Sequence, residues 1–153
     1  MGFIYGGNIM TATFFGHKDT PKEIEPTLRS TLIDLIENKN VTVFYVGNNG
    51  NFATMVRRQL EDLSQLYTIT YSVILAYLPT EKDKYDDLTH TIYPEGLENV
   101  PKRFAISWRN KWMIQKSDVV VTYVTHNFGG AAQFKEMAER QKKYVIAISN
   151  NSH

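Results

Sequence analysis

The sequence predicts a three-layer α/β domain with a mostly parallel central sheet. Short runs rich in Val, Ile, Phe and Tyr alternate along the chain with longer segments in which apolar residues have helical spacing. The short runs are apolar on both faces, which is typical of parallel strands covered by helices on each side. The chain has 153 residues, the size of one domain with a continuous core.

We exclude the first nine residues from the predicted domain, which covers residues 10–150. Residues 6–10 read Gly-Gly-Asn-Ile-Met, which a ribosome-binding site followed by a start codon could encode. Residues 1–9 are therefore either an extension upstream of a natural start at Met10 or a disordered N-terminus. In both cases the Gly-Gly turn has no partner motif that would make it a phosphate loop.

Strands and helices alternate in the predicted order β-α-β-α-β-loop-α-β-α-β. The strands are runs of β-branched and aromatic residues, and the helices have one apolar face. Expected strands cover residues 11–15, 41–46, 69–78, 118–124 and 143–148. Expected helices cover residues 22–38, 52–65, 101–116 and 130–141.

Proline residues mark several of these boundaries. Pro21 suits the start of the first helix, and Pro101 stands at a favoured first position of the third. Pro79 stops the third strand. Residues 80–100 are polar and rich in turn-forming residues. We therefore expect a surface loop with at most one short turn of helix, long enough to be functional.

Two glycine-containing loops join a strand to a helix. The first is Gly47-Asn-Asn-Gly50, and the second is Thr125-His-Asn-Phe-Gly-Gly130. Glycine lets the backbone approach a ligand, and the helix start offers unpaired N–H groups and a positive dipole end to an anion. Because the carboxyl ends of parallel strands meet at one edge of a sheet, both loops and His17 are expected to share one pocket. Two such loops suggest a nucleotide-like ligand.

Composition excludes several classes of protein. The net charge is +1, so we expect no nucleic-acid partner and no membrane partner. The chain lacks cysteine, which excludes disulfides, a thiolate nucleophile and cysteine-based zinc sites. The four histidines are scattered and no carboxylates pair at ligand spacing, so no metal is expected. We expect no cofactor either. No membrane-span or signal-peptide pattern is visible, and a cytoplasmic location is the expectation.

Six stretches form an ordered set of motifs. They are Thr13-Phe-Phe-Gly-His-Lys-Asp19, Phe44-Tyr-Val-Gly-Asn-Asn-Gly-Asn-Phe52, Leu75-Ala-Tyr-Leu-Pro79, Ile92-Tyr-Pro-Glu-Gly-Leu97, Pro101-Lys-Arg-Phe-Ala-Ile-Ser-Trp-Arg-Asn110 and Thr122-Tyr-Val-Thr-His-Asn-Phe-Gly-Gly-Ala131. In this order they resemble the YpsA-like branch of the SLOG superfamily, over nearly all of residues 11–148. That superfamily includes the "lonely guy" phosphoribohydrolases, DprA-type DNA-processing proteins and sensor domains of antiphage systems. The resemblance implies a Rossmann-like fold with a nucleotide-related ligand over the glycine loops.

The chain keeps part of the phosphoribohydrolase pattern. Arg109 matches the first residue of an Arg-Lys pair, and Asn110 replaces the Lys. Gly129, Gly130 and Glu136 match the first two glycines and the glutamate of the glycine loop, whose proline, third glycine and threonine are replaced. The resemblance implies that Arg109 and Glu136 are catalytic if the protein cleaves an N-glycosidic bond. The lost phosphate donors favour binding over hydrolysis.

The favoured function is therefore binding of a nucleotide-derived small molecule, such as an ADP-ribose-type, cyclic or mononucleotide signal. The protein would act as a sensor, or as a phage-type protein that sequesters an antiphage defence signal. The alternative is a nucleoside 5′-monophosphate phosphoribohydrolase, and a third option is a regulatory interaction protein with a vestigial pocket. The expected ligand-binding residues are Gly16, His17, Lys18, Gly47, Asn48, Asn49, Gly50, Arg109, Thr125, His126, Asn127, Gly129, Gly130, Gln133 and Glu136.

Aromatic side chains predict self-association. Phe104, Trp108 and Trp112 have helical spacing in segment 101–116, and Met137 follows on the next helix. These apolar side chains exceed what one small core easily covers, so we expect a homodimer or a larger even assembly.

Overall fold

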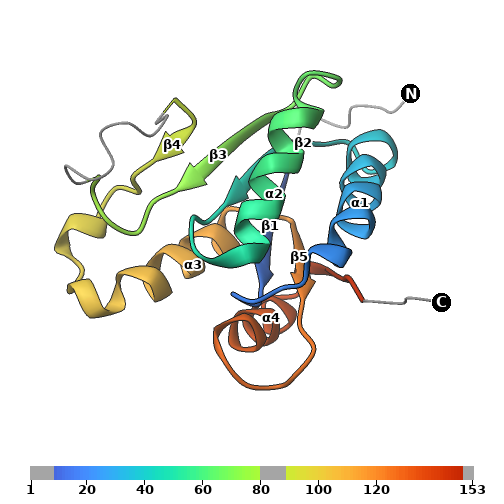
Figure 1. The fold of residues 1–153 in the computed structure, drawn as a ribbon. Helices are drawn as coiled ribbons and strands as arrows, with labels where there is room; N and C mark the ends of the chain where they lie inside the picture. The colour runs from blue at the N-terminus through green and yellow to red at the C-terminus, as the bar shows by residue number, and fades with distance from the viewer. Residues whose placement is uncertain (1–8, 80–88, 150–153) are drawn as a thin grey trace.

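A computed structural model describes residues 9–79 and 89–149, and these form an α/β structure around one parallel sheet (Figure 1). Our expectations for residues 1–8 and for 80–88 of the long loop lie outside the described residues. Within them, six strands pair in the order β4-β3-β2-β1-β5-β6, and every neighbouring pair is parallel. The strands are β1 (Met10–Gly16), β2 (Val41–Val46), β3 (Thr70–Ile74), β4 (Thr91–Ile92), β5 (Val119–Tyr123) and β6 (Tyr144–Ala147).

In the same described residues, four α-helices connect these strands. They are α1 (Glu25–Asn38), α2 (Gly50–Leu63), α3 (Ala105–Gln115) and α4 (Gly130–Arg140). Short 3-10 turns are η2 (Lys22–Ile24), η4 (Leu97–Asn99) and η5 (Lys102–Phe104). None of the helices in the described part of the chain has the length and apolar character needed to cross a membrane.

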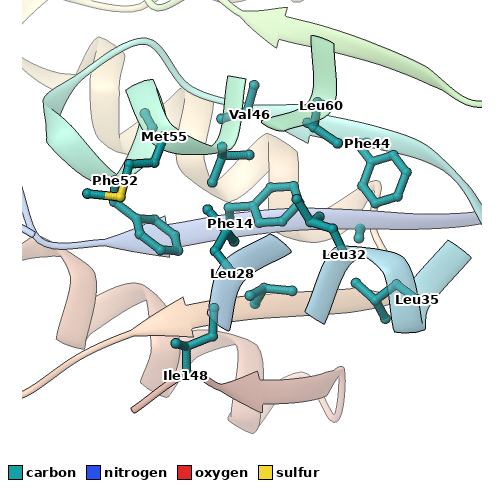
Figure 2. Close-up of a cluster of buried hydrophobic side chains, with 14 of the residues drawn as sticks. Phe14, Leu28, Leu32, Leu35, Phe44, Val46, Phe52, Met55, Leu60 and Ile148 are labelled. Carbon is teal, nitrogen blue, oxygen red and sulfur yellow. The ribbon is translucent and has the colours of Figure 1, made fainter. Parts of the chain in front are cut away.

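Helices α1 and α2 cover one face of the sheet. Leu28 and Leu32 of α1 and Leu60 of α2 pack with Phe14 of β1 and Phe44 of β2 in one buried cluster (Figure 2). Within each helix the buried residues recur every three or four positions, as Leu28, Leu32 and Leu35 do in α1, so they line the single face that points at the sheet. This cluster forms the larger part of the core.

Helices α3 and α4 cover the opposite face. Met113 of α3 and Phe134 of α4 pack in a second buried cluster with Phe15 and Val120 of the sheet. Phe14 and Phe15 therefore enter different clusters, because successive residues of a strand point to opposite faces. The predicted apolar strands with helices on both sides are confirmed.

The strand order reverses beside β1. From β1 the chain adds β2, β3 and β4 on one side, and it then crosses through α3 to place β5 and β6 on the other side. In such sheets a crevice opens at the carboxyl ends of the strands next to this reversal. The loops after β1, β2 and β5 meet there, so the two glycine loops flank the central strand as expected.

Several boundaries differ from the sequence-based expectation. A sixth strand, β4, lies in the segment expected to be loop, where Thr91 and Ile92 pair with the end of β3. A strand this short has too few residues to show an alternating pattern. Strand β3 ends at Ile74 rather than at residue 78, and α2 begins at Gly50 rather than at residue 52.

The aromatic side chains that predicted self-association are largely covered within the chain. The ring of Trp112 packs 5.3 Å from the ring of Tyr45, centroid to centroid. Trp108 packs against a small buried cluster beneath η4, and Met137 packs against the core on its own face. Phe104 alone of the four is largely exposed, at 50%. Most of the apolar surface from which a homodimer was inferred is therefore used internally.

Candidate functional site

A cavity of about 630 Å³ lies at the carboxyl ends of the central strands. Its walls are the segments that follow β1, β2 and β5, together with one face of α3. Nine of the residues expected at the site line it: Gly16, His17, Lys18, Gly47, Asn49, Arg109, His126, Gly129 and Gly130. Both glycine loops contribute residues to this cavity.

Arg109 projects from α3 to the wall of this cavity and is only 2% exposed. Its Nη1 donates hydrogen bonds to the carbonyl oxygen of Ile74 at 2.8 Å and to Oδ1 of Asn48 at 3.2 Å. Nη2 donates to Oδ1 of Asn49 at 3.0 Å, and Nε donates to Oδ1 of Asn110 at 2.8 Å. The guanidinium group therefore ties the end of β3 and the first glycine loop to α3.

All four acceptors of Arg109 are neutral oxygen atoms. Within residues 9–79 and 89–149, no carboxylate forms an ion pair with it. Burial accordingly lowers the pKa of Arg109 to about 10, since desolvation disfavours the charged form. The side chain stays protonated at neutral pH, and a buried cation of this kind is stabilised by any anion that enters the cavity.

The glycines of the first loop serve packing within the protein. A Cβ atom at Gly47 would lie 3.1 Å from Cζ of Arg109. Gly50 has φ +90, and a Cβ there would lie 2.9 Å from Cα of Lys18. The N–H of Asn51 donates to the carbonyl oxygen of Lys18 at 2.8 Å, so the first turn of α2 already has a backbone partner.

The second loop is built differently and leaves its backbone open to the cavity. Gly129 has φ +91 and ψ 176, a conformation that residues with a side chain avoid. A Cβ at Gly130 would meet nothing within 4 Å. No side-chain hydrogen bond caps α4, and Gly130 and Ala131 line the cavity. The N–H groups at the start of α4 can therefore donate to an anion.

Three aromatic rings form a stack that begins at the cavity wall, with His17 and His126, and ends at Phe128 in a neighbouring hollow. The ring of His17 lies 3.9 Å from that of His126, and His126 lies 4.0 Å from Phe128, with interplanar angles of 20° and 21°. Nε2 of His17 accepts the N–H of Thr125 at 2.9 Å, which requires the neutral imidazole with its proton on Nδ1. Burial and then the neighbouring His126 lower the pKa of His17, which favours this neutral form, while Asp19 acts in the opposite direction.

Six of the expected site residues do not line this cavity. Asn48 lines a separate hollow beyond β3, although its amide oxygen reaches Arg109. Thr125, Asn127, Gln133 and Glu136 line hollows on the outer side of the second loop. The structure thus brings Arg109 together with the glycine loops but keeps the outer residues of α4 apart from it.

Glu136 in particular lies away from Arg109. Its side chain is 68% exposed, and its Oε1 accepts a hydrogen bond from Arg140 at 3.3 Å, one helical turn on. Gly50 also faces the protein rather than the cavity, as described above. The two residues that the phosphoribohydrolase pattern pairs are therefore not brought to one cavity.

Several cavity residues were not expected from the sequence. Asp19 follows Lys18 at the rim, and Asn110 accepts the Nε hydrogen bond of Arg109. Ile106 and Met113 line the same wall, three residues before and four residues after Arg109. Helical spacing from Arg109 was the signal that could have identified the last two, because residues three and four apart share a face.

Metal ligands are not clustered in the described part of the chain. No group of three or more His, Asp or Glu side chains there is placed to hold a metal ion. The polar groups that face the cavity are instead an arginine, a lysine, an aspartate, amides and imidazoles. This set suits hydrogen bonding to an anion that also carries polar ring or sugar groups.

No protein-family model matches the sequence, and no curated protein matches it. Solved structures similar in fold include DNA processing protein A (DprA) from Streptococcus pneumoniae, with a TM-score of 0.70 and 14% identity. The match covers 94% of this chain and 52% of that chain, so this protein spans about half of that DprA. DprA from Helicobacter pylori, which binds single-stranded DNA, has a TM-score of 0.64 and 12% identity, covering 94% of this chain and 67% of that chain.

A third similar structure is the molybdenum cofactor carrier protein from Chlamydomonas reinhardtii. Its TM-score is 0.59 at 15% identity, covering 90% of this chain and 76% of that chain. Two different ligand classes are thus named among proteins with this fold. At such low identities the similarity establishes a DprA-like, Rossmann-like α/β fold and leaves the ligand to be argued from the site.

These similarities correct one expectation. From the net charge of +1 we expected no nucleic-acid partner, and that exclusion is wrong because a DprA of similar fold binds single-stranded DNA. Net charge is a sum over the whole chain, whereas strand binding depends on a local groove of cations and aromatic rings. A near-neutral chain can contain such a groove.

Proposed function

We propose that the protein binds a nucleotide-derived, phosphate-bearing small molecule in the cavity at the carboxyl ends of β1, β2 and β5. The principal support is Arg109, a guanidinium group that is 2% exposed, contacts neutral oxygen atoms and lines the cavity wall. Burying a cation without an anionic partner is costly, and a bound phosphate would offset that cost. The fold is consistent with ligand binding, since similar structures include a cofactor carrier protein.

The phosphate is best accommodated between Arg109 and the start of α4. At that helix start no side chain supplies a cap, and the face of Gly130 toward the cavity is open. The N-terminus of α2 is a poorer candidate because Asn51 already donates to Lys18. Lys18 at the rim adds a second positive charge to the same cavity.

Binding without hydrolysis agrees best with the placement of the acidic residues. The phosphoribohydrolase pattern pairs Arg109 with Glu136, but Glu136 pairs with Arg140 and lines outer hollows. The ordered motifs described above support membership of the YpsA-like branch of the SLOG superfamily. In that setting the ligand would be an ADP-ribose-type, cyclic or mononucleotide signal that the protein senses or sequesters.

Titration calorimetry with AMP and ADP-ribose tests this proposal. We expect at least one of the two to bind the wild-type protein. Gly130→Val should abolish binding, because the new side chain fills space where a Cβ meets nothing. Arg109→Ala should weaken binding by roughly 10- to 150-fold, the effect of losing one charge-assisted hydrogen bond.

Controls separate loss of the ligand site from loss of the fold. Thr54→Val places the same side chain in the first turns of α2, outside the cavity lining, and should bind as the wild type does. Unfolding in urea should be recorded for each variant, since Arg109 also holds Ile74, Asn48 and Asn49. The proposal fails if neither probe binds, or if both Gly130→Val and Arg109→Ala bind as tightly as the wild type.

A further inference from the structure

The ring stack described above ends in an unusually exposed aromatic side chain. Phe128 is 69% exposed, while one of its ring faces lies 4.0 Å from His126. A phenylalanine normally contributes to stability by burial, and here the loop holds the ring in solvent instead. The second face of Phe128 is therefore available to another flat group.

Two contacts hold the loop that contains Phe128, one with His17 at the end of β1 and one within the loop itself. His17, at the end of β1, is 9% exposed and accepts the N–H of Thr125. Nδ1 of His126 lies 3.0 Å from the carbonyl oxygen of Phe128, within hydrogen-bond distance. A ring fixed in this way loses little conformational freedom when a ligand stacks on it, which favours binding.

Phe128 lies beside a hollow that shares a wall with the Arg109 cavity. This outer hollow, of about 530 Å³, is lined by Phe128, Asn127, Gln133 and Glu136. Gly129 and Gly130 line both this hollow and the cavity of Arg109. A ligand that passes over the two glycines would reach both spaces, and no side chain stands in its way at Gly130.

The polar groups of the outer hollow suit the edge of a nucleobase. Asn127 and Gln133 each offer an amide donor and an amide acceptor, and the Glu136 carboxylate is an acceptor. Nucleobases combine such donors and acceptors with a flat aromatic face. The sequence placed these residues among the expected ligand contacts, and the structure separates them from the phosphate side.

We propose that Phe128 is a stacking surface for the base of the bound nucleotide, while the phosphate end lies in the Arg109 cavity. This inference rests on the proposed function. It adds that the base of the ligand lies in the outer hollow and that its phosphate lies in the Arg109 cavity. A free mononucleotide and one nucleotide unit of a single strand share this chemistry. The experiment must therefore distinguish the two sources.

Calorimetry with AMP and with ribose 5-phosphate, which lacks the base, isolates the stacking contribution. Phe128→Ala should weaken AMP binding by roughly 5- to 150-fold, the range of one base–aromatic stack. The affinity for ribose 5-phosphate should stay the same. Phe128→Trp should restore AMP binding, whereas Phe128→Leu, which is apolar but not flat, should not. A five-nucleotide oligodeoxyadenylate that binds more tightly than AMP and also depends on Phe128 would identify a single strand as the source.

The matched control is Phe104→Ala, which removes another exposed phenylalanine, 50% exposed and outside both spaces. It should leave AMP binding unchanged. The inference is overturned if the Phe128→Ala variant binds AMP as tightly as the wild type does. It is also overturned if the substitution weakens the binding of AMP and of ribose 5-phosphate equally. AMP binding that depends on Gly130 but not on Phe128 would overturn the stacking inference and leave the proposed function standing. If neither AMP nor ADP-ribose binds the wild-type protein, both the stacking inference and the proposed function are overturned.

Discussion

Arg109 and His17 are two buried polar side chains whose partners are neutral. Arg109 donates to three amide oxygens and one carbonyl oxygen, and His17 accepts a backbone N–H. Hydrogen bonding stabilises both side chains, but neither set of partners compensates a full charge. For Arg109 the result is a cavity that favours anions. For His17 the result is a preference for the neutral form.

The lowered pKa of His17 predicts pH-dependent stability. Burial is its main cause, followed by the neighbouring His126, and Asp19 opposes the shift. Because the folded-state pKa is below 6.5, the unfolded chain takes up the proton first as the pH falls. The free energy of unfolding should therefore be highest above pH 6.5 and should decrease from there toward the lowered folded pKa. Urea denaturation at pH values from 8 to 5 measures this.

His17→Gln is the control for the pH prediction. The amide oxygen of glutamine can accept the N–H of Thr125 and does not titrate in this range. The decrease in the free energy of unfolding below pH 6.5 should then be smaller than in the wild type. Identical slopes in the two proteins would assign the pH dependence to other groups.

At the scale of elements, β1 and α2 pack against each other at the edge of the cavity. Gly16 ends β1, and a Cβ there would lie 2.3 Å from Cγ of Phe52 of α2. Phe52 is 2% exposed and stacks on Tyr123 with centroids 6.5 Å apart, so its ring has little room to move. Gly16 thus positions α2, and with it the first glycine loop, against the central strand.

Gly16→Ala should destabilise the protein by about 1–3 kcal/mol, the usual cost of overpacking a well-packed core. Gly130→Ala is the matched control, because the same added methyl group meets nothing within 4 Å and helix starts tolerate alanine. Its free energy of unfolding should stay within about 0.5 kcal/mol of the wild type. Urea denaturation of both variants tests the contrast, and equal losses would contradict the packing role of Gly16.

For the molecule as a whole, ligand binding and folding are linked. The anion-favouring wall combines residues from α3, the loop after β2 and the start of α4, and these come together only in the folded chain. A ligand that binds the folded state alone must raise its stability. Thermal unfolding therefore reports occupancy of the site without any assay of chemistry.

We expect a midpoint increase of about 5–10 °C when AMP or ADP-ribose is present at about 100 times its Kd. This follows from about 2.7 kcal/mol of linkage energy and the usual sensitivity of a domain of this size. Gly130→Val should melt near the wild-type temperature without ligand and should show no increase with it. Differential scanning calorimetry provides both values, and an equal increase in the variant would place the ligand elsewhere.

The sequence by itself determined the fold class and most of its elements. Apolar runs such as Val41–Val46 and the helical spacing of Leu28, Leu32 and Leu35 depend on local periodicity, which is readable without any tertiary contact. The glycine loops were identifiable as candidates because their residue types and their positions after strands are local too, and Arg109 was identifiable from its match to the phosphoribohydrolase pattern. Strand β4 was missed because pairing with β3, rather than its two residues, makes it a strand.

Only the tertiary structure decided what each candidate does. Gly50 and Gly130 look alike in the sequence, yet one faces Lys18 and the other faces open space. Glu136 is separated from Arg109 by the direction in which α4 presents it, and Phe128 became a candidate only when its stack with His126 was seen. These distinctions depend on how helices and loops from distant parts of the chain meet around β1. Packing between elements sets this arrangement, and local periodicity in the sequence contains no information about that packing.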